Sequence, residues 1–412
     1  MNFVTDIHPI EFDGFIAAHS TGHYMKTSLW GKYKSSVDHQ RYFTTGLRDE
    51  NQQLVACALV LEEKRINGLV KLHFVPWGIC ADASDTQLTD RLYRELIAFA
   101  KRRKVAFLRI SPNVLRIERD LDGHAIHNGI NNEHVTEQLA SLGFIHKGYG
   151  YAYDGSWLNR YTLILDITPD LDEIIAHFEK TKRNLLIKQK TIGMTSRYGR
   201  DDELSYLVEF GSELADKLKF KPKQLSYFVE LKKHLGDSAV FIVSELDMNV
   251  LIDSIDAELA GRKFAKDPEA LASKQKERRM ADDLMKRYGP HPVIAAGLFI
   301  TLGDKCWNVY TYNAKDFARY VATDNLHEFA IAEMKKSGIR SYDMVGFSGV
   351  IDKSDAYYGL YSYKRSFLPN YVEYIGEFDY VANPSLYTLF KRTEHLGKRI
   401  RRKLSTLLTP KK

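Results

Sequence analysis

The chain has 412 residues, of which 44% are hydrophobic and 27% are charged. This length exceeds what one hydrophobic core usually organises, so we expect two globular domains. No apolar run approaches the length that crosses a bilayer, and the first residues carry acids where a secretory signal carries basic residues. We therefore expect a cytoplasmic protein rather than an exported or integral membrane protein.

The cysteines support the same location. Cys57, Cys80 and Cys306 are widely spaced and form no CxxC or Cys/His motif. A sparse and odd-numbered set favours a reducing compartment and argues against a structural metal site. We expect neither a metal nor a cofactor.

The first half of the chain predicts a hairpin, a helix and a strand. Residues 54–78 predict two strands joined by a turn at Asn67-Gly68, and residues 92–110 predict an amphipathic helix followed by a buried strand. The second half repeats this order, because residues 292–314 predict a hairpin with a turn at Gly303-Asp304 and residues 326–344 predict a helix and a strand.

The two copies also match residue by residue. At one constant offset, Leu92, Ile97 and Val105 correspond to Leu326, Ile331 and Ile339. A duplicated strand, helix and strand unit of this kind is typical of an α/β (α+β) protein with two tandem acetyltransferase-like (GNAT-like) domains. We place domain 1 at residues 1–155 plus about 370–412, and domain 2 at residues 156–369.

The second copy carries an insert at 247–291, where the first copy has only a short turn. The insert is rich in charged residues and alanine, has a sparse apolar stripe, and is interrupted near its middle by Pro268. Proline breaks a helix, so we expect two antiparallel helices forming a coiled-coil arm. A charged disordered linker is the alternative.

The net charge of +6 is concentrated at the C-terminal end. After Phe390 the chain holds nine lysine and arginine residues against one acid, Glu394. The apolar residues of this end recur at roughly helical spacing, at Leu386, Leu389, Phe390, Leu396, Ile400, Leu404 and Leu407. The pattern predicts a basic amphipathic helix that suits an anionic membrane surface or an RNA backbone, with a solvated charged end as the alternative.

A tyrosine-rich segment precedes this tail. Residues 357–378 contain six tyrosines and only two basic residues, Lys364 and Arg365. Alternating tyrosine and apolar residues favour a half-buried strand with turns at Gly359 and Pro369.

Motifs spread over nearly the whole chain resemble the Fem/Mur (FemABX) transferases, and most closely the MurM and MurN members. The matching stretches, in chain order, are LWGKYK, KTKRNLLIKQKTIG, LKFKPKQLSYF, WNVYTYNAKDFARY, GFSG, GLYSYKRSF and YIGEF. The resemblance implies an enzyme that moves an amino acid from aminoacyl-tRNA onto the stem peptide of a peptidoglycan precursor, building the interpeptide cross-bridge.

The resemblance also implies site residues. Lys34 matches a lysine that contacts precursor phosphate, and Tyr310 matches a tyrosine that contacts substrate. Lys223 and Tyr227 stand where the family has an arginine followed four residues later by a tyrosine. The positive charge is therefore kept, but the planar guanidinium group of arginine is lost.

Two further residues answer why a lysine stands among so many rings. GLYSYK matches a family motif that places Tyr363 at an aromatic position, and Lys364 at the lysine associated with the tRNA 3′ end and the transition state. A ring can stack on the terminal adenine, and a lysine can meet phosphate or a developing oxyanion. The family usually has P-R-G-P where this chain has Pro76-Trp77-Gly78-Ile79, so precursor contact through that loop is not carried over.

The residues leave several alternatives open. Acetyl-CoA enzymes of this fold carry R/Q-x-x-G-x-G/A, which is absent here, yet a GNAT-type acyltransferase with another activated donor stays possible, as does a non-catalytic module that binds tRNA or membrane. An aminoacyl ester is already activated and needs no cofactor beyond aminoacyl-tRNA as co-substrate. No general base stands out. The sequence does not reveal whether Ala, Ser or Gly is transferred. Lipid II is the favoured acceptor, but the sequence does not settle it against UDP-MurNAc-pentapeptide.

Overall fold

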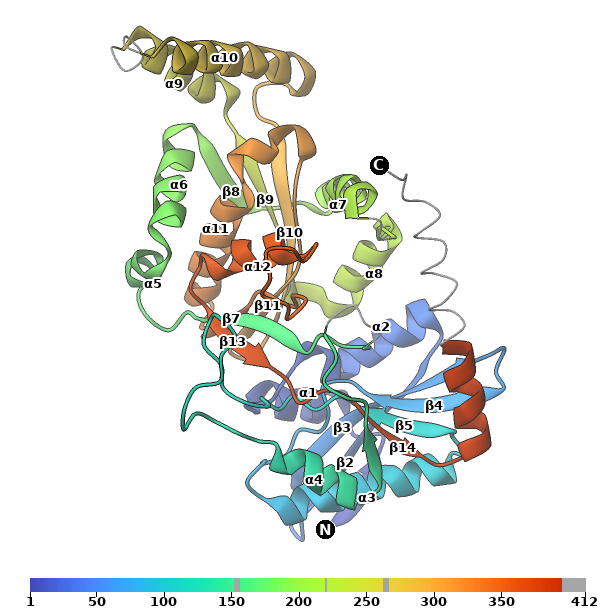
Figure 1. Cartoon of the computed structure of the whole chain (residues 1–412). Coiled ribbons are helices and arrows are strands. Elements are labelled where there is room, and N and C mark those ends of the chain that lie inside the picture. Colours follow the sequence, from blue (N-terminus) through green and yellow to red (C-terminus); the bar gives the residue numbers. More distant parts are fainter. Residues whose placement is uncertain (152–155, 219–220, 262–266, 395–412) are drawn as a thin grey trace. The chain divides into compact units, whose positions relative to one another are not determined.

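The computed structural model describes residues 1–151, 156–218, 221–261 and 267–394 (Figure 1). The chain divides into two compact units. Unit 1 comprises Met1–Asp120, His124–Tyr161 and the residues from Val372 onward, and unit 2 comprises Leu121–Gly123 and Thr162–Tyr371. The predicted domains are units that fold independently. A division into compact units does not test independent folding, so the predicted boundaries stay a prediction.

Unit 1 is built on one seven-stranded sheet. In spatial order its strands are β1 (Asn2–Thr5), β2 (Arg41–Arg48), β3 (Leu54–Arg65), β4 (Val70–Val75), β5 (Phe107–Ile110), β14 (Phe378–Val381) and β6 (Phe144–His146). Only β4 and β5 run parallel. A parallel pair needs a crossover, and α3 (Thr86–Arg102) provides it. Helices α1 (Pro9–Ala18), α2 (Ser28–Asp38) and α4 (His134–Ser141) also belong to unit 1.

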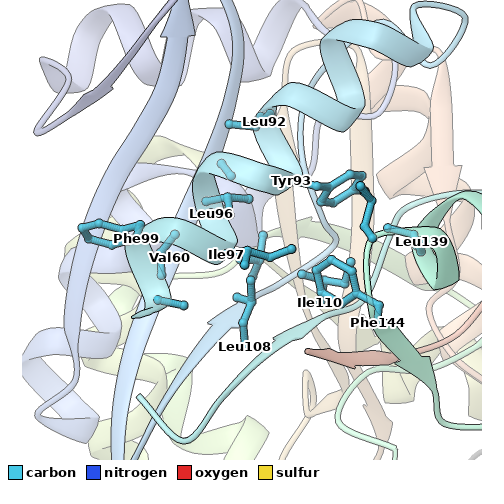
Figure 2. Close-up of a cluster of buried hydrophobic side chains, with 14 of the residues drawn as sticks. Val60, Leu92, Tyr93, Leu96, Ile97, Phe99, Leu108, Ile110, Leu139 and Phe144 are labelled. Atoms are coloured by element: carbon cyan, nitrogen blue, oxygen red, sulfur yellow. The ribbon is translucent and has the colours of Figure 1, made fainter. Parts of the chain in front are cut away.

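The core of unit 1 lies between α3 and the sheet, as Figure 2 shows. Asp85 caps α3 by accepting a hydrogen bond from the Leu88 amide at 2.9 Å. Apolar side chains at helical spacing then face the strands, and they meet residues of β3, β5, β6 and α4: Leu92, Tyr93, Leu96 and Ile97 on the helix, with Val60, Leu108, Ile110, Phe144 and Leu139 opposite.

A buried ion pair fixes β14 between β5 and β6. The Arg109 guanidinium donates to both carboxylate oxygens of Asp379, at 2.7 and 2.8 Å, and neither side chain is exposed. A bidentate pair of this geometry specifies a register, because losing one partner would leave a buried charge. It holds the returning C-terminal segment in the sheet of unit 1.

Unit 2 is built on a second seven-stranded sheet. In spatial order its strands are β13 (Asn370–Glu373), β7 (Tyr161–Asp166), β12 (Ser341–Asp343), β11 (Lys305–Asn313), β10 (Val293–Leu302), β9 (Ala239–Leu246) and β8 (Met194–Tyr198). β11 and β12 are parallel, and α11 (Thr323–Lys336) crosses between them. The remaining helices outside the insert are α5 (Leu171–His177), α6 (Lys180–Thr191), α7 (Ser205–Leu218), α8 (Leu225–Leu235) and α12 (Tyr358–Arg365).

The predicted duplication is confirmed. Each unit contains an antiparallel hairpin, a helix and a strand parallel to the second hairpin strand, as β3-β4-α3-β5 and as β10-β11-α11-β12. The matched residues Leu92 and Leu326 are both fully buried. Both predicted turns form, with Gly68 and Gly303 in the left-handed region at φ +88° and +57°.

The insert of unit 2 forms two helices that pack against each other between β9 and β10 (Figure 1). These are α9 (Met248–Ala260) and α10 (Pro268–Tyr288), so the predicted break lies where α10 begins. Ion pairs join the helices, from Arg278 to Asp256 at 2.7 Å and from Lys274 to Glu258 at 3.0 Å. Supercoiling of the arm stays a prediction.

Only the beginning of the basic tail is described. Residues 384–394 are helical, and the Phe390 ring packs on Phe107 with centroids 4.9 Å apart. This first part of the tail is therefore attached to unit 1, whereas the rest of the predicted amphipathic helix, from residue 395, lies outside the described residues. No helix in the described ranges combines the length and the apolar character needed to cross a membrane.

Candidate active site

The tyrosine-rich segment is a helix where the sequence favoured a strand. α12 covers Tyr358–Arg365, and β13 follows it from Asn370. The helix buries Tyr361 and Lys364, which are three residues apart and therefore share a face. The strand expectation for this part was wrong, because tyrosines at alternating positions also satisfy a short helix that has one buried face.

Lys364 is held by three backbone carbonyls. Its side chain is 7% exposed, and Nζ donates to the carbonyl oxygens of Met344, Val345 and Gly346 at 2.7, 2.8 and 3.0 Å. An ammonium group has three N–H donors, so the turn at residues 344–346 uses all of them. In this conformation a substrate oxygen can bind Lys364 only by replacing one of the carbonyls.

Asp343 supplies the charge that balances this ammonium group. Burial lowers the pKa of Lys364 to about 8, and the Asp343 carboxylate opposes the shift. Burial also raises the pKa of Asp343 to about 6, against hydrogen bonds from the Thr162 hydroxyl and the Val345 amide and against the charge of Lys364. Both groups are therefore charged at pH 7.

The turn between these two charges is strained. Val345 has φ +58°, a left-handed conformation that a β-branched residue rarely adopts. Its amide donates to Asp343 at 2.7 Å, and its carbonyl accepts from Lys364 at 2.8 Å. Strain persists only where the surroundings enforce it, and such positions cluster at functional sites. We call Asp343, Val345 and Lys364 the lysine clasp.

Tyr363 is half-buried and contacts a second group of buried side chains beside the clasp. Its hydroxyl donates to Thr323 Oγ1 at 3.1 Å, and Lys182 Nζ lies 4.2 Å from the centroid of its ring. Lys182 comes from α6, is 5% exposed, and donates to the fully buried Asp324 at 2.7 Å. Burial lowers the pKa of Lys182 and raises the pKa of Asp324, each against the charge of the other.

His327 completes this group as a neutral ring. It lies on α11, hydrogen-bonds through Nδ1 to the Tyr342 hydroxyl at 2.5 Å, and packs 6.2 Å from the Tyr363 ring. Burial, with smaller effects from Lys182 and Lys364, lowers the pKa of His327 to about 3. The imidazole is thus uncharged at neutral pH.

Three predicted substrate residues come together elsewhere in unit 2. The Tyr310 hydroxyl donates to the Tyr227 hydroxyl at 3.0 Å, with the two rings edge to face, and Lys223 Nζ lies 4.4 Å from the Tyr227 centroid. Tyr227 and Tyr310 come from α8 and β11, and Lys223 precedes α8. The exposed lysine is therefore set against an aromatic pair that can help to orient it.

Lys34 lies in unit 1, on α2. Thr27 caps this helix by accepting from the Trp30 amide at 3.2 Å. Lys34 pairs with Asp38 one turn later and lies 5.9 Å from the Trp30 centroid. Its head group is partly exposed, so an anionic ligand would compete with Asp38 for it.

Sequence reasoning missed Asp343, Lys182, Asp324 and His327. Lys182 lies in a segment quoted for the family resemblance, but one lysine among several gives no sign of burial. Asp324 is 142 residues away from it along the chain, and their contact needs the fold. Among the described residues, no group of three His, Cys, Asp or Glu side chains is placed to hold a metal ion.

Comparison with known proteins places the chain in a family. A model of the FemAB family matches residues 7–395. The chain belongs to the FemAB family. The predicted relationship to the Fem/Mur transferases is thereby confirmed.

Its relatives span nearly its whole length. The lipid II:glycine glycyltransferase of Staphylococcus haemolyticus (strain JCSC1435) is 25% identical, with 93% of this chain and 94% of the relative covered. The enzyme of the same description from Staphylococcus epidermidis (strain ATCC 12228 / FDA PCI 1200) is 24% identical, with 96% and 95% covered. A crystal structure of FemX covers 94% of this chain and 99% of its own, with a TM-score of 0.77 at 21% identity, a likeness that shows the fold. The predicted fold class of two tandem α/β units is confirmed.

The clasp predicts a pH dependence of stability. Because the folded pKa of Lys364 is about 8 and its ordinary value is 10.5, the unfolded chain binds more protons between these pH values. The contribution of Lys364 to stability therefore rises with pH in this window. Relative to Lys364→Met, the free energy of unfolding of the wild type should increase by about 1.4 kcal/mol per pH unit above pH ~8.

Urea unfolding of both proteins from pH 7 to 10 measures this difference. Lys276→Met, at an exposed lysine of α10, is the matched control, and its difference from the wild type should not change with pH. A constant difference for Lys364→Met as well would contradict a desolvated lysine in the clasp.

Proposed function

We propose that this protein transfers an amino acid from aminoacyl-tRNA to the stem-peptide amine of a peptidoglycan precursor, in the cytoplasm. The observation that carries the proposal is the FemAB match over residues 7–395, together with relatives of nearly equal length that are lipid II:glycine glycyltransferases. We take lipid II as the acceptor, and Gly, Ala or Ser as the amino acid transferred.

The reaction needs orientation and charge stabilisation. The amine of the stem peptide attacks the ester carbonyl of the aminoacyl-tRNA, a C–N bond forms, and the tRNA hydroxyl leaves. Negative charge develops on the carbonyl oxygen, and a preorganised positive group in a water-poor site stabilises it most. Lys364 is such a group, because it is buried and charged at pH 7. We propose that the substrate oxygen replaces one of its three carbonyl partners.

Tyr363 is proposed to bind the tRNA 3′ end. Lys182 covers one face of its ring at 4.2 Å, so a base would stack on the opposite face. The bond to Thr323 fixes the ring orientation. Lys364, the next residue of α12, is proposed to meet the esterified ribose of a tRNA end stacked there.

The remaining predicted site residues are proposed to bind the acceptor substrate, the peptidoglycan precursor. Lys223, with Tyr227 and Tyr310, and separately Lys34, are proposed to bind the phosphate or other anionic groups of the precursor. Asp343 is a poor candidate for the general base, because its Oδ1 already accepts hydrogen bonds from Thr162 and Val345 and its side chain is buried, at 7% exposure. A substrate group is left to carry the proton.

A transfer assay tests the function. Purified protein is incubated with lipid II or UDP-MurNAc-pentapeptide and with tRNA charged with glycine, alanine or serine, and acetyl-CoA is offered in parallel. We expect one aminoacyl-tRNA to extend the stem peptide of lipid II by one residue, detected by mass, and ribonuclease treatment to abolish the product. Transfer from acetyl-CoA alone would favour the acyltransferase alternative, and binding without any transfer would favour the non-catalytic module.

Lys34 and Lys223 should affect precursor binding. A charge-assisted hydrogen bond to an anion is lost when either becomes alanine, so the precursor KM should rise about tenfold while kcat changes less than about twofold. Lys32→Ala and Lys221→Ala remove exposed lysines two positions earlier and serve as matched controls. Steady-state kinetics with varied precursor measure this, and an unchanged KM in both variants would overturn the assignment.

The basic tail is proposed to hold the enzyme on the anionic inner membrane surface. Each basic residue near such a surface contributes about 1 kcal/mol, and salt weakens the attachment. Truncation after Glu394 keeps the Phe390 contact with Phe107 and removes seven of the nine basic residues after Phe390.

The full chain should sediment with anionic liposomes at low salt, and the truncated chain should not. Activity on lipid II should fall more than activity on the soluble precursor. Equal sedimentation of both chains, or an equal loss on both precursors, would contradict membrane attachment by the tail.

A further inference from the structure

Two of the three cysteines face each other in unit 1. Cys57 lies within β3, and Cys80 follows the turn after β4. Their backbones form an antiparallel bridge in which each amide donates to the carbonyl of the other at 2.8 Å. Residues that exchange both hydrogen bonds have Cα atoms about 5.5 Å apart, within the range of about 4.4–6.8 Å that disulfides span.

The side chains of the pair are also in contact. Burial and a hydrogen bond between the two thiols raise the pKa of Cys57. The same hydrogen bond, reinforced by the nearby charge of Lys26, lowers the pKa of Cys80 to about 5. The lowered pKa favours Cys80 as the thiolate of the pair. Thiolates are the reactive form of cysteine.

The positive charge beside Cys80 comes from Lys26, which is bonded to the segment that carries Cys80. Lys26 is 1% exposed, and its Nζ donates to the carbonyls of Thr21 and Ile79 at 2.8 and 3.1 Å. Ile79 immediately precedes Cys80, so these bonds hold the ammonium group beside the thiol pair. The same segment contains Trp77 and Gly78, consecutive residues in the left-handed region at φ +57° and +68°.

We propose that Cys57 and Cys80 form a reversible disulfide under oxidation by a hydroperoxide. The Cys80 thiolate attacks one peroxide oxygen, the S–O bond forms, the O–O bond breaks, and hydroxide leaves. The Cys57 sulfur then attacks the sulfenic acid, the S–S bond forms, and water leaves after the Cys57 proton is released. Two thiols lose two electrons, and hydrogen peroxide is reduced to two waters.

The disulfide would join β3 covalently to the Trp77–Cys80 segment. Both sulfurs are buried, with Cys57 0% and Cys80 1% exposed, so peroxide reaches them when this segment opens. A dithiol reductant reverses the reaction by thiol–disulfide exchange. In a reducing compartment the pair is at rest as thiols, and the bond forms on exposure to peroxide.

Cys306 provides an internal control in the same molecule. It is also fully buried, but it lies on β11 in unit 2, and the sequence has no fourth cysteine to partner it. Burial raises the pKa of its thiol, and the nearby carboxylate of Asp343 adds to the shift. A protonated thiol without a partner is expected to survive peroxide that oxidises the pair.

The experiment counts thiols in the full-length protein. Reduced protein is treated with hydrogen peroxide, freed of it, and labelled with a maleimide in denaturant. We expect one label, on Cys306, a linked peptide containing Cys57 and Cys80, and three labels again after treatment with dithiothreitol. Three labels after peroxide, or oxidation of Cys306 as fast as the pair, would overturn the proposal.

A second measurement distinguishes disulfide formation from irreversible oxidation of the thiols. Cys57→Ser removes the resolving thiol, so Cys80 should accumulate as a sulfenic acid that dimedone traps, whereas Cys80→Ser should give no trapped product at residue 57. Thermal melts establish whether each variant folds. If a variant does not fold, the thiol count of the wild-type protein alone tests the disulfide. Sulfinic acid at Cys80 in the wild type, without the linked peptide, would also contradict the proposal.

Discussion

The candidate site depends on one ammonium group and the three carbonyls that surround it. Taking a lysine charge out of water costs several kcal/mol, which hydrogen bonds to a charged donor, about 1.5–3 kcal/mol each, can offset when all three are made. Those bonds close the turn at 344–346 around the left-handed Val345, and Asp343 holds the same turn from its amide side. Charge balance, backbone strain and helix position are thus coupled through Lys364.

This coupling gives a physical reason for a buried lysine at the proposed reaction site. A fixed cation in a poorly solvated site stabilises negative charge that appears only in the transition state, and it needs no reorganisation at that moment. The neighbouring group of Lys182, Asp324 and Tyr363 fixes an aromatic ring beside it. On this view α12 places the ring and the cation in adjacent positions, one for the tRNA end and one for the reacting ester.

The duplicated fold could be read from the sequence, because Leu92 and Leu326 repeat a core pattern that local periodicity exposes. The helical insert could also be read, since Pro268 marks where its second helix begins. The candidate site could be predicted only in part from the sequence. Lys223, Tyr227 and Tyr310 are brought together as a set, but α12 was expected as a strand, and the partners of Lys364 could not be predicted. Those partners are backbone atoms of a turn whose left-handed valine violates the usual preference.

A double-mutant cycle between Lys364→Met and Val345→Gly tests the clasp most directly. Glycine adopts a positive φ without strain, so a turn that contains it should depend less on the lysine. The account predicts that Lys364→Met costs at least about 1 kcal/mol less in the Val345→Gly background than in the wild type, measured by urea unfolding at pH 7. Additive losses, agreeing within about 0.5 kcal/mol, would show that Lys364 does not hold the strained turn and would contradict the account.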